Sequence, residues 1–494
     1  MYTFLNRPIT RTSLCLLYLI ALAIRVVVFE SYIKYGKRYN QPDTGSYFLP
    51  ALSLALGKGM TDPSNGRLIF WRTPGYPLFL APFYYMQGIT TSSFDAYAGA
   101  HYKAMWAQII MCAVIPPLAV LLAFSLTESL PIAWLTGLLT TIHPGLILSS
   151  CYVMTDGIAT LLFMICLLFL SYGFVWYKGQ IHKHAYRYIA YAAVFFALFT
   201  WVRPMGQFLM MVMPLLFFID MTSWQVQWRK MLLFFLVSVG LLMPWYIRNY
   251  YWTGRVFFCP MSGCMLNVFS APKLLRRLTG QDYRTCWQEQ LRKGSQEVLK
   301  EQIRLKKEGS CYVVPEHQIV GNAAWPLIKE NPGGFAYDWL VQVIKTTFDL
   351  TSSQQLARFA NNTFFYDDLE EFLLDKYWLC LYAQPMPIWM RVISYVEALL
   401  SVIKWILLFI GFGIFFLAPL IGSMRGAPSK ADGVMWRWWR VWFWCCFIIG
   451  GTLIMTGAFG YARLRLPIDA LLIILALMPL IYYLDLKHSS IRSS

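Results

Sequence analysis

The chain has 494 residues, of which 58% are hydrophobic, 17% aromatic and only 14% charged. This composition excludes a soluble globular protein, because runs of about 20 apolar residues recur and each is long enough to cross the hydrocarbon core of a bilayer. The formal net charge is +17. Cytoplasmic loops and anionic headgroups account for such a charge in a membrane protein, and no nucleic-acid-binding motif is present.

The first apolar segment follows Arg7 and Arg11 without a clear cleavage site, so we expect a retained first span. Together the apolar segments predict an all-α polytopic membrane protein with about ten transmembrane helices. The predicted spans cover residues 12–30, 104–126, 131–149, 157–177, 187–202, 205–220, 231–247, 396–421, 440–460 and 467–484.

Residues 76–92 form a further apolar segment, which contains Pro77 and Pro82 and many aromatic side chains. This composition favours a helix that lies in the membrane interface over one that crosses it. With that choice, all the short basic segments fall on one face, which the positive-inside rule makes cytoplasmic. These segments are residues 7–11, 178–187, 229–230, 422–440 and 487–492.

The same topology places the first long loop, residues 31–103, and the polar segment 249–391 on the outer face. We therefore divide the chain into three parts. Residues 1–248 form a membrane catalytic module, residues 249–391 a mostly helical outer-face segment, and residues 392–494 the C-terminal transmembrane helices. The outer face is predicted to be the periplasmic or exterior side of a bacterial inner membrane.

The eleven cysteines are scattered without a CxxC pair or a Cys/His spacing typical of zinc, so no metal ligands are predicted. Four of them fall in the outer-face segment, where an oxidising compartment would permit one or two disulfides. The sequence leaves disulfides and free thiols equally open for these four. They are Cys259, Cys264, Cys286 and Cys311.

Asp43 stands between Pro42 and Gly45, just after the first apolar span. An acidic side chain at this point lies where membrane and water meet, which is a place for chemistry on a lipid. The alternative is that Asp43 caps a helix beginning near Ser46. Arg72 follows on the same loop and precedes Thr-Pro-Gly-Tyr-Pro.

Arg203 interrupts an apolar run of some thirty residues and is followed by Pro204. As a hairpin, each arm of this run rises about 22 Å, which is short of the roughly 30 Å hydrocarbon core. An arginine at such a depth is costly unless it faces a polar cavity or an anion, so Arg203 is a candidate functional residue. The alternative is an arginine that reaches to the headgroups beside a helix-ending proline.

Further polar residues fall on the same outer face. Asp156 either orients a substrate, holds an arginine, or caps the helix that starts at Gly157. Near the C-terminus, Arg463 and Arg465 form a tight connection that clamps an anion or pairs with Asp469 and lipid phosphates.

Several short motifs occur in a fixed order along most of the chain. They are Pro42-Asp43 with the downstream Arg72-Thr73-Pro74-Gly75-Tyr76-Pro77, Met154-Thr155-Asp156, Arg203-Pro204, Trp245-Tyr246-Ile247-Arg248-Asn249 and Ala462-Arg463-Leu464-Arg465-Leu466-Pro467. In this order they resemble the polyprenyl-phosphate-sugar-dependent glycosyltransferases of the C superfamily. The likeness is greatest to bacterial relatives of the protein O-mannosyltransferases and of the aminoarabinose lipid A transferase.

The resemblance implies a catalytic role for Asp43, a second acidic role for Asp156, and phosphate binding by Arg72. Many eukaryotic members have an Asp-Glu pair in the first loop, whereas Asp43 is followed by Thr44. This departure does not support a metal-binding role at Asp43, so we predict no required cofactor and leave a divalent metal open. The predicted pool of donor-binding arginines is Arg72, Arg203, Arg248, Arg463 and Arg465, with Tyr47 and Tyr76 as substrate-positioning residues.

The predicted activity is inverting transfer of a sugar from a polyprenyl-phosphate donor to lipid A, another envelope glycan or a protein. Asp43 acts as the general base, and the arginines stabilise the phosphate that leaves. The predicted partners are the lipid-linked donor, a lipid or glycan acceptor and membrane lipids. Two alternatives are a transporter or flippase for an anionic lipid, and a glycan polymerase or ligase that does not need Asp43 as a base.

Overall fold

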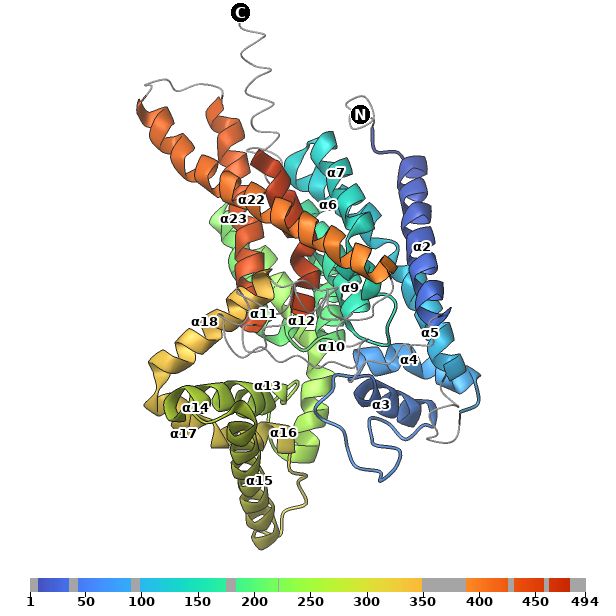
Figure 1. The fold of residues 1–494 in the computed structure, drawn as a ribbon, viewed down its shortest axis with the longest axis vertical. Helices are drawn as coiled ribbons and strands as arrows, with labels where there is room; N and C mark the ends of the chain where they lie inside the picture. Colours follow the sequence, from blue (N-terminus) through green and yellow to red (C-terminus); the bar gives the residue numbers. More distant parts are fainter. Residues whose placement is uncertain are drawn as a thin grey trace, which may run out of the picture.

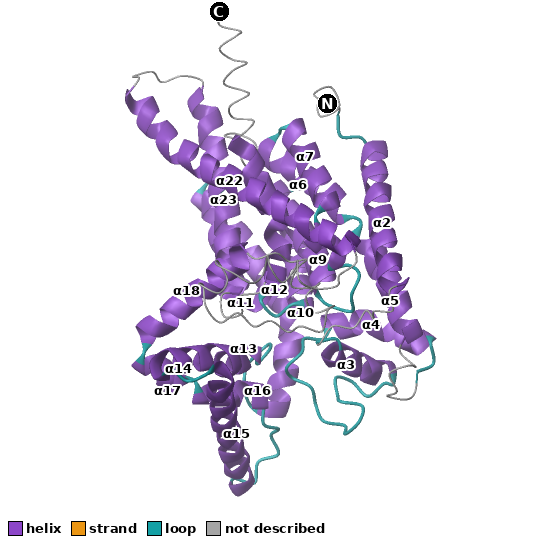
Figure 2. Cartoon of the chain, in the orientation of Figure 1, coloured by secondary structure: helices purple, strands orange, loops and turns teal. Residues whose placement is uncertain are grey.

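The computed structural model describes residues 8–34, 43–89, 98–174, 184–220, 222–348, 388–424, 431–456 and 462–479. Within these ranges the chain is almost entirely helical (Figure 2). The β pairing found there is one isolated bridge between Thr61 and Leu68. The all-α fold class predicted from the sequence is confirmed.

Long helices form a bundle in which α9 packs against α10 and α6 against α7 (Figure 1). Among the described residues, six segments are long and apolar enough to cross a membrane: Arg11–Ser31, Ala98–Thr127, Asp156–Gly173, Ala185–Val202, Trp224–Thr253 and Tyr395–Gly413. The helices of the bundle are α2 (Arg11–Lys34), α5 (Ala98–Cys112), α6 (Ile115–Thr127), α7 (Leu130–Ile142), α9 (Asp156–Gly173), α10 (Ala185–Val202), α12 (Trp224–Thr253), α22 (Ile388–Met424) and α23 (Ala431–Thr456).

The described part of each of the ten predicted spans is mainly helical, but several of these helices are interrupted. Pro116 and Pro117 stand in the first turn of α6, which separates α6 from α5. Proline has no backbone N–H and favours the start of a helix, so one apolar run becomes two helices. The shorter pieces are α8 (Pro144–Leu148), α11 (Gly206–Val212), η2 (Met213–Ile219), η6 (Ala462–Ile468) and a final helix over residues 469–479.

The first loop carries two short helices, α3 (Gly45–Ala55) and α4 (Gly75–Met86), which pack against each other at one end of the bundle (Figure 1). The 12 residues of α4 rise only about 18 Å, which is too short to cross a hydrocarbon core of about 30 Å. Two short helices in this loop are confirmed, and their place in the membrane interface stays a prediction.

Residues 254–348 follow α12 and are mostly helical. Of the outer-face segment predicted at residues 249–391, residues 349–387 lie outside the described part of the chain. Its helices α13 to α17 lie at the same end of the bundle as α3 and α4, which we call the loop end (Figure 1). The described cysteines of this segment, Cys259, Cys264, Cys286 and Cys311, are all free thiols. The elements are α13 (Met261–Met265), η3 (Leu266–Ser270), α14 (Ala271–Thr279), α15 (Tyr283–Lys307), α16 (Glu316–Ile319), η4 (Val320–Ala323), α17 (Trp325–Glu330) and α18 (Pro332–Phe348).

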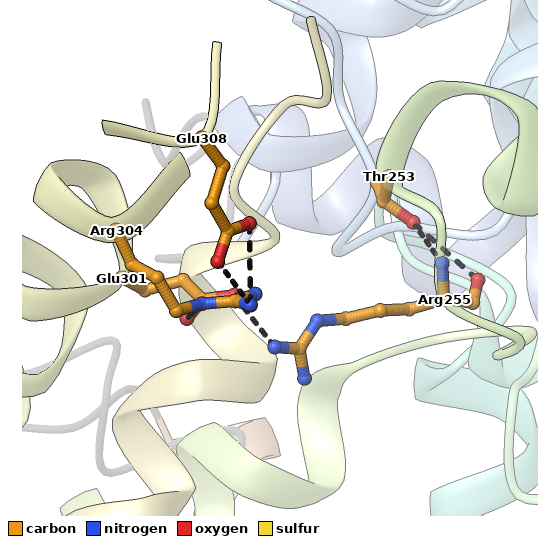
Figure 3. A network of polar contacts seen from close by, with 5 residues as sticks. All are labelled: Thr253, Arg255, Glu301, Arg304 and Glu308. Carbon is orange, nitrogen blue, oxygen red and sulfur yellow. Dashed lines mark hydrogen bonds and ion pairs between the residues drawn. The ribbon is translucent and has the colours of Figure 1, made fainter. Parts of the chain in front are cut away.

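A polar network joins α15 to the end of α12 (Figure 3). Arg255 donates from its backbone N–H to Thr253 Oγ1 at 3.2 Å and from its guanidinium to Glu301 Oε1 at 2.7 Å. Arg304 donates to both Glu301 and Glu308. Hydrogen bonds from Arg304 and then Arg255 lower the pKa of Glu301 to about 2. The network therefore fixes α15 relative to the bundle.

Candidate active site

Asp43 and Arg72 face each other across the first loop. The Arg72 guanidinium donates from Nε to Ser46 Oγ at 2.9 Å and from Nη1 to the Tyr47 hydroxyl at 3.0 Å. Its Nη2 lies 3.6 Å from Asp43 Oδ1. The side chains of Arg72 and Asp43 are 17% and 37% exposed, so both groups are accessible to a substrate.

The turn that contains Asp43 leads into α3. The N-cap residue of α3 is Thr44, and it makes no side-chain capping bond. The capping alternative for Asp43 would place its carboxylate on the first amides of α3. What the structure records at this turn is the backbone carbonyl of Asp43, which accepts from the Ser46 amide at 3.0 Å.

Asp156 and Arg203 form a second, buried pair. Arg203 Nη1 donates to Asp156 Oδ1 at 2.7 Å, and the two side chains are 9% and 4% exposed. Asp156 is the first residue of α9, where the amino end of a helix favours a negative charge. Arg203 directly follows α10, and its backbone N–H donates to the Phe199 carbonyl. The arginine in the broken span is thus held by a carboxylate.

Two hydrogen bonds and one close contact bring the pairs together. Thr44 Oγ1 donates to the Val153 carbonyl at 3.1 Å, which joins the residue after Asp43 to the turn before Asp156. Thr73 Oγ1 donates to the Val202 carbonyl at 3.4 Å, which joins the residue after Arg72 to the one before Arg203. A Cβ on Gly75 would lie 2.6 Å from the Trp201 carbonyl, so only glycine fits there.

Tyr47 and Tyr76 pack on the buried side of the Asp43–Arg72 pair. Their rings meet edge to face with centroids 5.4 Å apart. The buried Tyr76 hydroxyl donates to Gln108 Oε1 at 3.0 Å, while Gln108 Nε2 donates to the carbonyls of Ser149, Ser150 and Tyr152. Gln108 was not predicted as a site residue, although an amide inside an apolar span was a usable signal.

Arg248 anchors the first loop to α12. Its guanidinium donates to the carbonyls of Ile69 and Met60 at 3.1 and 3.3 Å. It also lies over the Phe70 and Trp245 rings, at 4.7 and 4.5 Å from their centroids. Arg248 Nη1 also donates to Asn249 Oδ1 at 2.9 Å. Three of the five N–H donors of the guanidinium are thus used within the protein, which favours a role in holding residues 60–70.

Arg465 is buried, 1% exposed, and pairs with Asp469. Its Nε donates to Asp469 Oδ1 at 2.8 Å, and its Nη1 donates to the carbonyls of Thr346 and Thr347. The Asp469 alternative from the sequence is therefore confirmed for this arginine. Arg463 is the second residue of η6, after Ala462. The Arg463 side chain lies outside the described part of the chain.

The segment 254–348 contributes a side chain that sequence reasoning missed. The His317 ring stacks on Trp71 with centroids 5.3 Å apart and planes 14° from parallel. Arg72 lies 4.9 Å from the same Trp71 ring. Burial, and then the charge of Arg72, lower the pKa of His317 to about 4, so the imidazole is neutral at pH 7. No sequence signal linked His317 to residues 71 and 72.

The sequence predicts no metal ligands and leaves a divalent metal open. Among the residues that the structure describes, no three His, Cys, Asp or Glu side chains come together as a group that could hold a metal ion. The acidic residues at the candidate site are Asp43 and Asp156, and each has an arginine beside it.

Comparison with known proteins gives one structural relative. No protein-family model matches the chain, and no curated protein matches it in sequence. The archaeal oligosaccharyltransferase AglB from Archaeoglobus fulgidus, solved in complex with an inhibitory peptide and a dolichol-phosphate, matches 97% of this chain with a TM-score of 0.50 and 11% sequence identity. The chain spans about half the length of that protein, since the match covers 52% of it. At this identity the likeness shows that this chain shares its helical fold with the matched part of AglB.

Proposed function

We propose that this protein is a membrane glycosyltransferase of the C superfamily. It moves a sugar from a polyprenyl-phosphate donor to an acceptor hydroxyl. The observation that carries the proposal is the accessible Asp43–Arg72 pair, held beside the buried Asp156–Arg203 pair at the loop end. The fold shared with an oligosaccharyltransferase that was solved with a dolichol-phosphate supports the same class of donor.

Asp43 accepts the proton in the proposed reaction. The acceptor O–H gives its proton to the Asp43 carboxylate as the oxygen attacks the anomeric carbon of the donor sugar. The bond between this carbon and the phosphate oxygen breaks, and its electron pair leaves with the phosphate. A single displacement of this kind inverts the configuration of the sugar. General-base catalysis of this type contributes roughly 10²- to 10⁴-fold to a rate.

Arg72 stabilises the departing phosphate. Ser46 and Tyr47 orient its guanidinium through two hydrogen bonds, and Nη2 remains 3.6 Å from Asp43, beyond hydrogen-bond distance. A planar guanidinium suits two oxygens of one phosphate. Arg248 supports this arrangement by holding the backbone of residues 60–69. Asp156 and Arg203 form the buried pair beside them, and the contacts of Thr44 and Thr73 hold the first loop against the turns that carry this pair.

The acceptor approaches from the side of residues 254–348. The stacked Trp71 and His317 rings place this segment next to Arg72. A neutral imidazole donates and accepts hydrogen bonds without changing the local charge, which suits contact with sugar hydroxyls. We place the reaction at the outer face of a bacterial inner membrane, with lipid A, another envelope glycan or a protein as the acceptor.

The test is rescue of a null strain with wild-type, Asp43→Asn and Asp62→Asn chains, followed by mass spectrometry of envelope lipids, glycans and glycoproteins. Asp62 is the matched control, since it is an acidic residue of the same loop that bonds to Ser64 and Asn65. In the null strain we expect one envelope species to become lighter by the mass of a sugar. The heavier, sugar-bearing form returns with the wild type and with Asp62→Asn, and stays absent with Asp43→Asn.

The rival functions predict other results. A transporter or flippase changes which leaflet holds the lipid and leaves the sugar on each species unchanged in mass. A polymerase or ligase changes glycan length and tolerates Asp43→Asn. Full rescue by Asp43→Asn contradicts the proposed role of this carboxylate.

A further inference from the structure

A groove in the membrane part of the chain lies between α7, α22 and the helix over residues 469–479. It encloses about 60 Å³ and is lined mainly by aliphatic side chains, among them Leu139, Leu400, Leu407 and Ile473. One water-sized group needs only about 10–15 Å³ of such space. The groove therefore has room for about four to six heavy atoms, which is the size of a phosphate group.

The groove opens toward the lipid. The side chains that flank it on α22 are apolar and exposed, with Leu399 at 62%, Ile403 at 45% and Ile406 at 53%. Ile142 on the α7 side is 44% exposed. Exposed aliphatic side chains on a membrane-spanning helix face acyl chains, so a lipid reaches the groove from the bilayer without passing through water.

Three polar side chains gather in this apolar groove: Lys404, Ser401 and His143. Lys404 is the cation, and its side chain is 8% exposed. Its Nζ lies 3.7 Å from Asp469 Oδ1 and 5.2 Å from the centroid of the Trp405 ring. Both distances exceed that of a hydrogen bond, so the ammonium keeps donors for another acceptor.

His143 supplies a further N–H. Its Nδ1 accepts from the Leu146 backbone amide at 3.3 Å, which leaves the proton of a neutral ring on Nε2. That Nε2 lies 3.7 Å from Asp469 Oδ2, again beyond hydrogen-bond distance. Ser401 adds a hydroxyl to the same groove. An ammonium, an imidazole N–H and a hydroxyl together suit the oxygens of a phosphate.

The charges around the groove limit which phosphate fits. Asp469 is bonded to Arg465 at 2.8 Å, and the buried Glu397 acts on Lys404 and His143. The cluster contains two cations, Lys404 and Arg465. It also contains two carboxylates, Asp469 and Glu397, so it has no net charge when His143 is neutral. A phosphodiester adds one negative charge to such a cluster, whereas a phosphomonoester adds up to two at neutral pH. The cluster therefore favours the phosphodiester.

We propose that this groove binds a bilayer phospholipid, with its phosphodiester at Lys404, Ser401 and His143 and one acyl chain along the aliphatic wall. From Leu400 to Leu407, α22 rises only about 10 Å, which matches part of one acyl chain and leaves the remainder in the bilayer. This site is separate from the Asp43–Arg72 pair and does not depend on the proposed transferase activity. The bound lipid ties α22 to α7 and the final helix.

The test is native mass spectrometry of the full chain in detergent, titrated with phosphatidylglycerol or with diacylglycerol of the same acyl chains. Wild-type protein retains phosphatidylglycerol and releases diacylglycerol. Lys404→Gln weakens retention of phosphatidylglycerol by roughly tenfold or more, because a hydrogen bond to a charged group is lost. The matched control is Arg440→Gln, which removes a cation of α23 that does not line the groove and leaves retention unchanged.

A second variant keeps the test valid where Lys404→Gln does not fold. Leu407→Trp fills the groove while leaving the charged cluster intact, and it lowers phosphatidylglycerol retention to the level of diacylglycerol. Equal retention of the two lipids by the wild type overturns the proposal, as does unchanged retention in Leu407→Trp. Tighter binding of a polyprenyl monophosphate than of phosphatidylglycerol also overturns it, because the neutral cluster then accepts a second charge.

Discussion

The two acid–arginine pairs at the loop end have the same chemistry and opposite exposure. Asp43 and Arg72 lie 3.6 Å apart with side chains 37% and 17% exposed, whereas Asp156 and Arg203 lie 2.7 Å apart and are almost fully buried. A loose pair in contact with solvent is free to exchange its partner for a substrate. A short buried pair is not, because separating it leaves an uncompensated charge. This difference in exposure supports the proposal that the first pair carries the chemistry and the second holds the site together.

The strongest test of this division is Asp43→Asn in the exposed pair. We expect the transfer rate to fall by roughly 10²- to 10⁴-fold, because this variant loses the proposed general base. The free energy of unfolding should change by about 1 kcal/mol or less, since exposed ion pairs contribute little to stability. Single-turnover transfer and thermal unfolding in detergent measure the two effects. A large fall in stability together with the loss of activity would place Asp43 with the support.

The buried pair should respond in the opposite way. Arg203→Met leaves the Asp156 carboxylate buried without its cation, so we expect a loss of about 3–5 kcal/mol in the free energy of unfolding. Adding Asp156→Asn to this variant removes the unpaired charge and should restore most of the loss. Thermal unfolding of the single and double variants checks this. If the double variant is no more stable than Arg203→Met, the pair is not the unit that supports the loops.

Arg72 and Arg248 sharpen the comparison within the arginine pool. Arg72→Gln removes the guanidinium proposed to bind the departing phosphate, and we expect a loss of about 2–4 kcal/mol in transition-state stabilisation. Arg248→Gln removes a loop anchor, so its unfolding temperature should fall more than that of Arg72→Gln. Steady-state transfer kinetics and thermal unfolding distinguish these outcomes. Equal kinetic losses with unchanged stability in both variants would mean that Arg248 also contacts the donor.

Apolar patterning predicts the helices of this fold well, because a bilayer demands long runs of one kind of residue. The segments predicted at residues 12–30 and 157–177 match α2 and α9 within a few residues. The breaks were harder to predict, since one run over residues 104–126 carries two prolines and becomes α5 and α6. Local sequence does set such a break, but not how far the chain bends there.

The site could be predicted only in part. Asp43, Arg72, Asp156 and Arg203 stand out as charges beside apolar runs, and the structure brings these four together. The sequence does not reveal which oxygen atom accepts the hydrogen bonds of each arginine. Arg465 donates to the carbonyls of residues 346 and 347, more than a hundred positions away. Lys404 gave a signal that was missed, since a lysine within an apolar span is costly unless it has a partner.

Another acid–arginine cluster, at Glu301, provides an exposed reference for the two pairs at the loop end. Glu301 is bound by Arg255 and Arg304, and the Arg304 side chain is 52% exposed. Hydrogen bonds from Arg304 and Arg255 lower the pKa of Glu301 from an ordinary value of 4.5 to about 2. A depressed pKa stabilises the fold above about pH 4.5, and this contribution is lost as the pH falls toward 2.

We expect Glu301→Gln to lower stability at pH 6 by about 1 kcal/mol or less, because water screens a partly exposed pair. The difference from the wild type should shrink as the pH falls below 4.5, since protonation of Glu301 then removes the same charge from the wild type. Thermal unfolding at several pH values measures this. Glu308→Gln is the matched control, since Glu308 is 52% exposed and meets Arg304 at 3.2 Å, and it should have a smaller effect. A difference that does not vary with pH would show that the Glu301 side chain acts through packing, and its charge would then be no reference for the pairs at the loop end.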